Sequence, residues 1–297
     1  MVARPAGIAQ VRPSPIAGRW YPGSPSRLAA AVDGFLGLAR LPMLSGTVVA
    51  VVAPHAGHVY SGPVAGYAFA ALRGLAPDLV ALVGPLHDPD ARPLLGSAHE
   101  AYQTPLGAVP VDHDATAELA RHLREADGLP LALVARDMEH SLEIELPFLQ
   151  RALKPGFRLL PVMVSTLDRR VSRGLGRALA AVLRCRSSLL VASTDLSHYH
   201  DQETARRLDA EMLRRVEALD PEGVLTAEEE GAGYACGAGA LAAVLWACRD
   251  LGADRVRILR YATSGDVTGE NDSVVGYAAA IATRGASAGI GGSGDRA

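Results

Sequence analysis

Short apolar runs alternate with longer amphipathic segments along most of the chain. The apolar runs are nearly continuous, as in "GTVVAVVA" and "SLLVAST", which is typical of strands buried on both faces. We expect strands at 46–53, 78–84, 158–165, 188–194, 256–262 and 274–282. Helical spacing of apolar residues predicts helices at 25–40, 62–74, 114–127, 139–153, 167–184, 201–219 and 237–251. Strands and helices that alternate in this way predict a layered α/β fold.

The same pattern predicts one domain. No linker rich in Pro, Gly or Ser divides the middle of the chain, so we assign 16–284 to a single α/β domain. Residues 1–15 lack apolar periodicity and are expected to form a loose arm. The Gly/Ser/Ala-rich segment 285–297 is expected to be a disordered tail.

Composition narrows the classes of protein. The 297 residues are 49% hydrophobic and 21% charged, which is ordinary for a globular protein with a large core. The net charge of -3 gives no basic footprint, so we expect no nucleic-acid partner. The sequence contains no run of about 18 apolar residues, so we expect no membrane span. It also lacks the apolar core behind a basic start that marks a secretory signal. We therefore expect a cytoplasmic protein with reduced cysteines.

Several chemically active side chains follow the predicted strands directly. His55 comes after "VVAVVA" and His87 after "LVALVG", whereas Asp195 and His198 follow "LLVAST". Cys236 stands just before a predicted helix. Because ligands of such sheets bind beyond the carboxyl ends of the strands, these residues are expected to meet at one rim.

Metal binding is the chemistry for which these residue types suit one another. Two neutral imidazoles and a thiolate bind borderline divalent ions and leave coordination positions open. A third histidine off the metal would serve as acid or base, and Asp195 could orient its ring. Each residue alone also has a structural interpretation, as a loop cap or helix cap. Two further histidines, His58 and His140, are candidates for a supporting shell.

The other cysteines and serines carry weaker signals. Cys185 and Cys248 lie in helical apolar patterns and are expected in the core. Ser61 and Ser197 lie near histidines, but neither stands in a GxSxG nucleophile elbow, so a metal-independent hydrolase is a distant alternative.

Many segments together resemble the Memo family, in particular its prokaryotic members called AmmeMemoRadiSam system protein B. The matching segments cover nearly the whole chain except the arm and the tail. They include "AGRWYPGSPSRL", "APHAGHVYSGPVAGYAF", "GPLHDP", "YQTPLGAVPVD", "EHSLEIELPFLQ", "STDLSHYH", "CGAGA" and "YATSGDVTGENDSVVGYAA".

The resemblance implies a three-layer α/β/α fold with a central, mostly parallel sheet, similar to class III extradiol dioxygenases. Those enzymes hold iron(II) with two histidines and a glutamate. By correspondence, His55 and His87 are the metal ligands, Cys236 stands where the glutamate would be, and His198 is the acid/base accompanied by Asp195. Iron(II) is the implied metal, with copper or zinc as alternatives. The thiol changes the ligand field and invites oxidation of the site itself.

Leu86 is a second departure, since the family has a small polar residue before the second histidine. Two functions stay open from the sequence. The first is a metal-dependent, dioxygenase-like oxidoreductase that acts on a small molecule. The second is a non-catalytic protein that binds a metal, an anionic peptide or a phosphate group in the same pocket. The family name also implies association with AMMECR1-domain and radical-SAM proteins.

Overall fold

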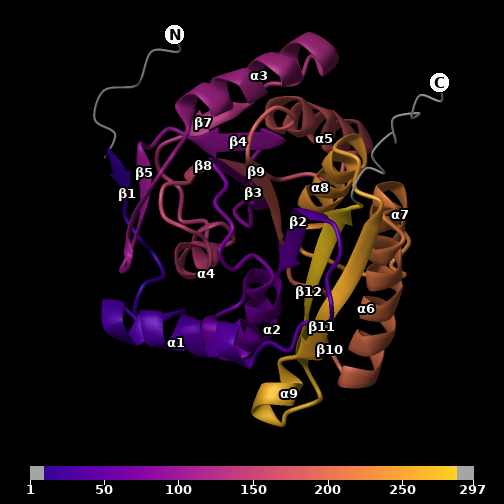
Figure 1. Ribbon diagram of the computed structural model, residues 1–297. Helices are drawn as coiled ribbons and strands as arrows, with labels where there is room; N and C mark the ends of the chain where they lie inside the picture. The colour runs from indigo at the N-terminus through magenta and orange to yellow at the C-terminus, as the bar shows by residue number, and fades with distance from the viewer. Residues whose placement is uncertain (1–9, 286–297) are drawn as a thin grey trace, which may run out of the picture.

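The computed structural model describes residues 10–285, and a nine-stranded sheet forms its centre (Figure 1). Its strands are β2 Thr47–Ala53, β3 Leu79–Pro85, β4 Leu94–Ser97, β7 Ala132–Val134, β8 Arg158–Val164, β9 Ser188–Ser193, β10 His198–His200, β11 Arg255–Thr263 and β12 Val274–Arg284. The order is β10-β12-β2-β9-β3-β8-β4-β7, with β11 paired to β12. A small second sheet contains β1 Val11–Arg12, β5 Ala101–Thr104 and β6 Gly107–Pro110.

Helices cover both faces of the large sheet. They are α1 Pro25–Leu38, α2 His58–Ala70, α3 His113–Asp127, α4 Leu146–Ala152, α5 Arg169–Leu183, α6 Gln202–Glu217, α7 Pro221–Glu229, α8 Ala238–Asp250 and the short α9 Gly265–Thr268. Helices α1, α2 and α4 pack together on one side, and α3, α5, α7 and α8 pack together on the other (Figure 1). The predicted three-layer α/β/α class is confirmed.

The centre of the sheet is parallel. Strands β2, β9, β3 and β8 run side by side in one direction, whereas β12 joins the β2 edge antiparallel and β4 joins the β8 edge antiparallel. All six predicted strands are present, within one or two residues at their ends. The carboxyl ends of β2, β9 and β3 therefore lie next to one another at one edge of the sheet.

Burial on both faces explains the continuous apolar runs. Along β3, the side chains of Leu79, Ala81 and Val83 enter the core beneath α5 and α8, while Val80 and Leu82 enter the core beneath α1 and α2. Since alternate residues of a strand point to opposite faces, both sets must be apolar. This double burial makes the central strands a firm base for the side chains at their ends.

Two predicted helices begin elsewhere. The helix predicted at 62–74 spans His58–Ala70 and includes Pro63 in its interior, one turn after the start. The helix predicted at 139–153 is confined to a 3₁₀ turn at Glu143–Glu145 followed by α4, with Pro147 in the first turn of α4. Proline suits the first turn because the amide hydrogen that it lacks has no partner there.

The N-terminal arm and one cysteine also differ from expectation. In the described part of the predicted arm, β1 pairs with β5, and Arg12 is 2% exposed because Asp137 and Glu143 bind its guanidinium. Residues 1–9, and the predicted tail from 286 onward, lie outside the described residues. Cys185 is exposed rather than in the core, because it lies beyond the end of α5, while Cys248 is buried as predicted. No helix in the described part of the chain has the length and hydropathy needed to cross a bilayer.

Candidate metal centre

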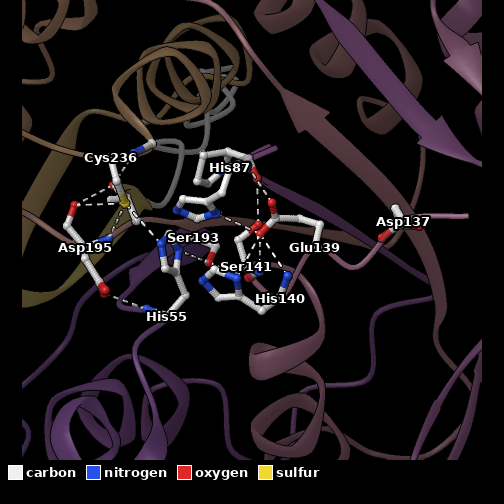
Figure 2. Close-up of polar contacts among 12 residues, drawn as sticks. His55, His87, Asp137, Glu139, His140, Ser141, Ser193, Asp195 and Cys236 are labelled. Carbon is white, nitrogen blue, oxygen red and sulfur yellow. Dashed lines mark hydrogen bonds and ion pairs between the residues drawn. The ribbon is translucent and has the colours of Figure 1, made fainter. Parts of the chain in front are cut away.

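Three of the predicted side chains meet at the carboxyl edge of the sheet. His55 follows β2, His87 follows β3, and Cys236 stands just before α8. One ligand atom of each lies within 4.8 Å of the other two, and the Nε2 atom of His55 is 3.0 Å from the Cys236 sulfur (Figure 2). All three line a cavity of about 690 Å³. The side chains come from segments up to 181 residues apart, so only the folded sheet assembles them.

Glycines allow Cys236 to approach the strand ends. A β-carbon placed on Gly237 would lie 2.8 Å from the carbonyl oxygen of Ser193, and one on Gly239 would lie 2.1 Å from that of Thr166. Both distances are too short for any larger residue. The segment "CGAGA" thus brings the start of α8 against β9 and places the thiol beside His55.

The ring of His55 is held by β9. Its Nδ1 atom lies 3.0 Å from the Ser193 hydroxyl, and its backbone N–H donates to Asp195 Oδ1 at 2.7 Å (Figure 2). Burial, reinforced by the neighbouring His140 and His87, lowers the pKa of His55 well below its usual value. The imidazole is therefore neutral, and Nε2 is the atom left to face the thiol.

The ring of His87 is held by Glu139. Its Nδ1 atom is 2.9 Å from Glu139 Oε1, and its backbone N–H donates to Glu139 Oε2 at 2.6 Å. Burial alone would raise the pKa of Glu139, but the bonds from His87 lower it to about 2. Burial alone would lower the pKa of His87, but Glu139 raises it. A carboxylate that accepts from one ring nitrogen fixes the other toward a metal.

Glu139 is a residue of the candidate site that the sequence did not identify. The sequence placed it in the first turn of a helix, whereas it lies in a loop and meets His87 across 52 residues. Together with His140, these two residues form a second group with metal-ligand geometry. The Glu139 oxygens, however, already accept from His87 Nδ1 and three backbone N–H groups. We therefore assign Glu139 to orienting His87.

The thiol stays protonated at neutral pH, and the carboxyl beside it is protonated below a pKa of about 7. Burial, with Asp195 as the next cause, raises the pKa of Cys236, although the residue is accessible from the cavity. Burial raises the pKa of Asp195 to about 7, even though backbone N–H groups of His55 and Ala56 bind it. The Asp195 N–H lies 3.2 Å from the Cys236 sulfur, so it is placed to stabilise a thiolate.

His198 lines the same cavity, and within residues 10–285 only one of its ring nitrogens has a hydrogen-bond partner. Its Nδ1–H donates to the Leu196 carbonyl at 2.8 Å, which leaves Nε2 unprotonated, and burial lowers its pKa. The expectation that Asp195 orients this ring is wrong, because Asp195 binds the backbone of His55 and the Leu196 carbonyl holds His198 instead.

The two other histidines predicted to support the site lie in different places. His140 lines the cavity between Trp20 and His87, with ring centroids 4.2 Å and 4.5 Å away, and burial lowers its pKa to about 4. His58 is 2% exposed and does not line the cavity. Its ring packs between Tyr21, Phe35 and Phe148. His58 thus supports the helix layer, whereas His140 forms part of the cavity wall.

Three exposed apolar side chains stand at the rim of the cavity. Val59 is 70% exposed, Tyr60 44% and Tyr199 78%, and all three line the opening. Arg19 lies at the same rim, and no carboxylate pairs with it among residues 10–285. The rim therefore offers apolar contact and one available positive charge.

The donor set fits a transition-metal ion. Both histidines have Nδ1 engaged by the protein, at Ser193 and Glu139, and one ring nitrogen of each lies within 4.8 Å of the Cys236 sulfur. Two imidazoles and one thiolate suit iron(II), zinc and copper, and three protein ligands leave positions open for other molecules.

Comparison with known proteins places this chain in a family. A sequence profile described as "Memo-like protein" matches residues 12–281. The chain belongs to the Memo family. It is 32% identical over 273 residues to a MEMO1 family protein of Nitrosopumilus maritimus, with 91% of this chain and 98% of the other covered. A MEMO1 family protein of Methanopyrus kandleri is 35% identical, with the same shares covered.

A solved structure shares the fold. The crystal structure of an uncharacterized protein from Escherichia coli K12 superposes with a TM-score of 0.50 at 15% identity, over 79% of this chain and 99% of that one. At this identity the likeness concerns the fold alone. The predicted Memo family and fold class are thus confirmed, while the roles of the site residues stay predictions.

Proposed function

We propose that this Memo-family protein holds a mononuclear metal ion, iron(II), at His55, His87 and Cys236, and carries out redox chemistry of the dioxygenase type on a small substrate. The observation that supports it most is that the protein binds the Nδ1 atoms of both histidines while one ring nitrogen of each lies within 4.8 Å of the same thiol, in one open cavity. Bound iron(II) would supply electrons and open coordination positions for dioxygen and substrate.

The residues around the ligands would do the remaining work. His198 is neutral with Nε2 free, so it can accept a proton from a substrate hydroxyl and later return it. The rings of Trp20, Tyr60 and Tyr199 can pack against a planar substrate. Arg19 can bind an anionic group of that substrate at the rim.

Metal content tests the proposal first. Protein purified without oxygen should contain close to one iron per chain, and His55→Ala and Cys236→Ala should lose it. Cys185→Ser is the matched control, because Cys185 is exposed and lies outside the cavity. His198→Gln should keep the metal but lose oxygen uptake with a catechol as the probe substrate. Absence of bound metal after anaerobic loading with iron(II), copper or zinc contradicts the proposal.

A second function has one specific observation in its favour. Arg19 stands unpaired, within the described residues, beside an apolar rim, which suits binding of an anionic ligand without turnover. Inorganic phosphate that binds the wild type but not Arg19→Gln would support this alternative. Turnover of any substrate by the purified protein would count against it.

A further inference from the structure

A fully buried acid is linked to the His55 ring through the Ser193 hydroxyl. Glu145, in the 3₁₀ turn before α4, is 0% exposed, and its Oε1 atom lies 2.8 Å from the Ser193 hydroxyl oxygen. Its other oxygen, Oε2, has no hydrogen-bond partner among residues 10–285. An ionised carboxylate with an unpartnered oxygen in such a place would be costly, because burial of a charge requires compensating bonds.

The Ser193 hydroxyl has three polar neighbours and one proton. They are Glu145 Oε1 at 2.8 Å, the Ser141 carbonyl oxygen at 2.7 Å and His55 Nδ1 at 3.0 Å. Figure 2 labels Ser193, Ser141 and His55. The carbonyl can only accept, so it takes the serine proton. If Glu145 were ionised, two acceptors would compete for that single proton, and one oxygen–oxygen contact would lack a hydrogen.

One arrangement gives every contact a proton. Ser193 donates to the Ser141 carbonyl, Glu145 donates through Oε1–H to Ser193, and His55 donates through Nδ1–H to Ser193. A hydroxyl oxygen can accept two hydrogen bonds while it donates one, so the three contacts are compatible. The same arrangement leaves the lone pair of His55 Nε2 facing the Cys236 thiol.

We propose that Glu145 is a neutral carboxylic acid that, through Ser193, holds His55 as the Nδ1–H tautomer and so directs Nε2 into the cavity. Glu145 is thus a positioning residue for a ligand that it does not touch. Burial, and the nearby Asp195 after it, also raise the pKa of Glu145 well above its usual value. The protonation states are properties of the metal-free protein, and only the effect on metal affinity rests on the proposed function.

Spectroscopy of the metal-free protein tests the two protonation states. At pH 8 the infrared spectrum of the wild type should contain the carbonyl stretch of a protonated carboxyl group that Glu145→Gln lacks. Nitrogen NMR should show the Nδ1–H tautomer for His55, assigned by comparison with His55→Ala. A difference spectrum without that stretch, or His55 protonated at Nε2, overturns the proposal whether or not the protein binds a metal.

Metal affinity tests the consequence, with Co²⁺ as the probe. Glu145→Gln should bind within about twofold of the wild type, because the amide can donate the same bond to Ser193. Ser193→Ala should bind about 10–100-fold more weakly, the usual effect of losing a partner that orients a ligand. If Glu145→Gln is weakened as much as Ser193→Ala, the carboxylate charge is needed and the proposal is wrong. If the wild type does not bind Co²⁺, the metal proposal fails while the spectroscopic test still decides the state of Glu145.

Discussion

Metal uptake by this site should release a proton from Cys236. Burial keeps the thiol protonated in the metal-free protein, and only the thiolate is a metal ligand. Burial lowers the pKa of His55, so this imidazole is neutral, whereas bonding to Glu139 raises the pKa of His87 above its usual value. Above the pKa of His87 one proton per metal therefore leaves, and the apparent affinity should rise about tenfold, or about 1.4 kcal/mol, for each pH unit.

The slope should steepen in acid. The pKa of His87 lies above 6.5, so below about pH 6.5 most molecules must release a second proton before binding. The slope of log affinity against pH then approaches about two, and not three, because His55 remains neutral.

A competition titration with a chromophoric chelator between pH 6 and 9, at fixed ionic strength, measures this slope for Co²⁺. Cys185→Ser should follow the wild type, since that thiol is exposed and lies outside the cavity. Cys236→Ser should bind more weakly, and its slope should be lower than that of the wild type by about one proton per metal. A wild-type slope near zero at pH 8 would refute the reasoning, because it would mean that the metal-free site already holds a thiolate.

Three further predictions concern stability, each measured by chemical denaturation of the metal-free protein. Gly239→Ala should cost about 2–3 kcal/mol of unfolding free energy, because its β-carbon would lie 2.1 Å from a backbone oxygen. The control Gly34→Ala has open space around it in α1 and should add about 0.5–1 kcal/mol. Equal effects of the two substitutions would contradict the packing argument. Arg12→Met should cost about 3–5 kcal/mol, because it leaves Asp137 and Glu143 buried without their cation, and a loss below about 1 kcal/mol would show that these acids find other partners. The folded protein keeps the Asp195 proton up to a pKa of about 7, whereas the unfolded chain loses it at the usual aspartate value of 3.8. The unfolding free energy should therefore fall as pH rises through that range, by up to about 4 kcal/mol. The unfolding free energy of Asp195→Asn should fall less, and a pH profile identical to that of the wild type would exclude this origin.

The residues at the ends of strands could be predicted because burial leaves a clear pattern in the sequence. His55 and His87 each interrupt a continuous apolar run, and Cys236 precedes a helix that begins with small residues. Since parallel strands end at one edge, their order along the chain was enough to bring these side chains together in space. The family resemblance then distinguished expected ligands from His198.

The partners that orient these ligands could not be predicted in the same way. Glu139 resembles a helix-start acid and Ser193 an ordinary strand residue, and their bonds to His87 and His55 span 52 and 138 residues. Nothing local in the sequence encodes such a distance. One local signal was available, since Pro147 marks the first turn of α4 and so argues against a helix that starts at Glu139.

The proposed metal ligands and the rim of the cavity are attached to parts of the molecule that differ in their tolerance of change. His55 and His87 extend from strands enclosed by two cores, whereas Val59, Tyr60 and Tyr199 are held by few neighbours at the surface. Substitutions at the rim can therefore accumulate during evolution without disturbing the ligand set, because surface changes usually cost less than about 0.5 kcal/mol. Descendants of such a protein could come to bind different small molecules by altering a few rim residues, while the residues at the strand ends are inherited unchanged.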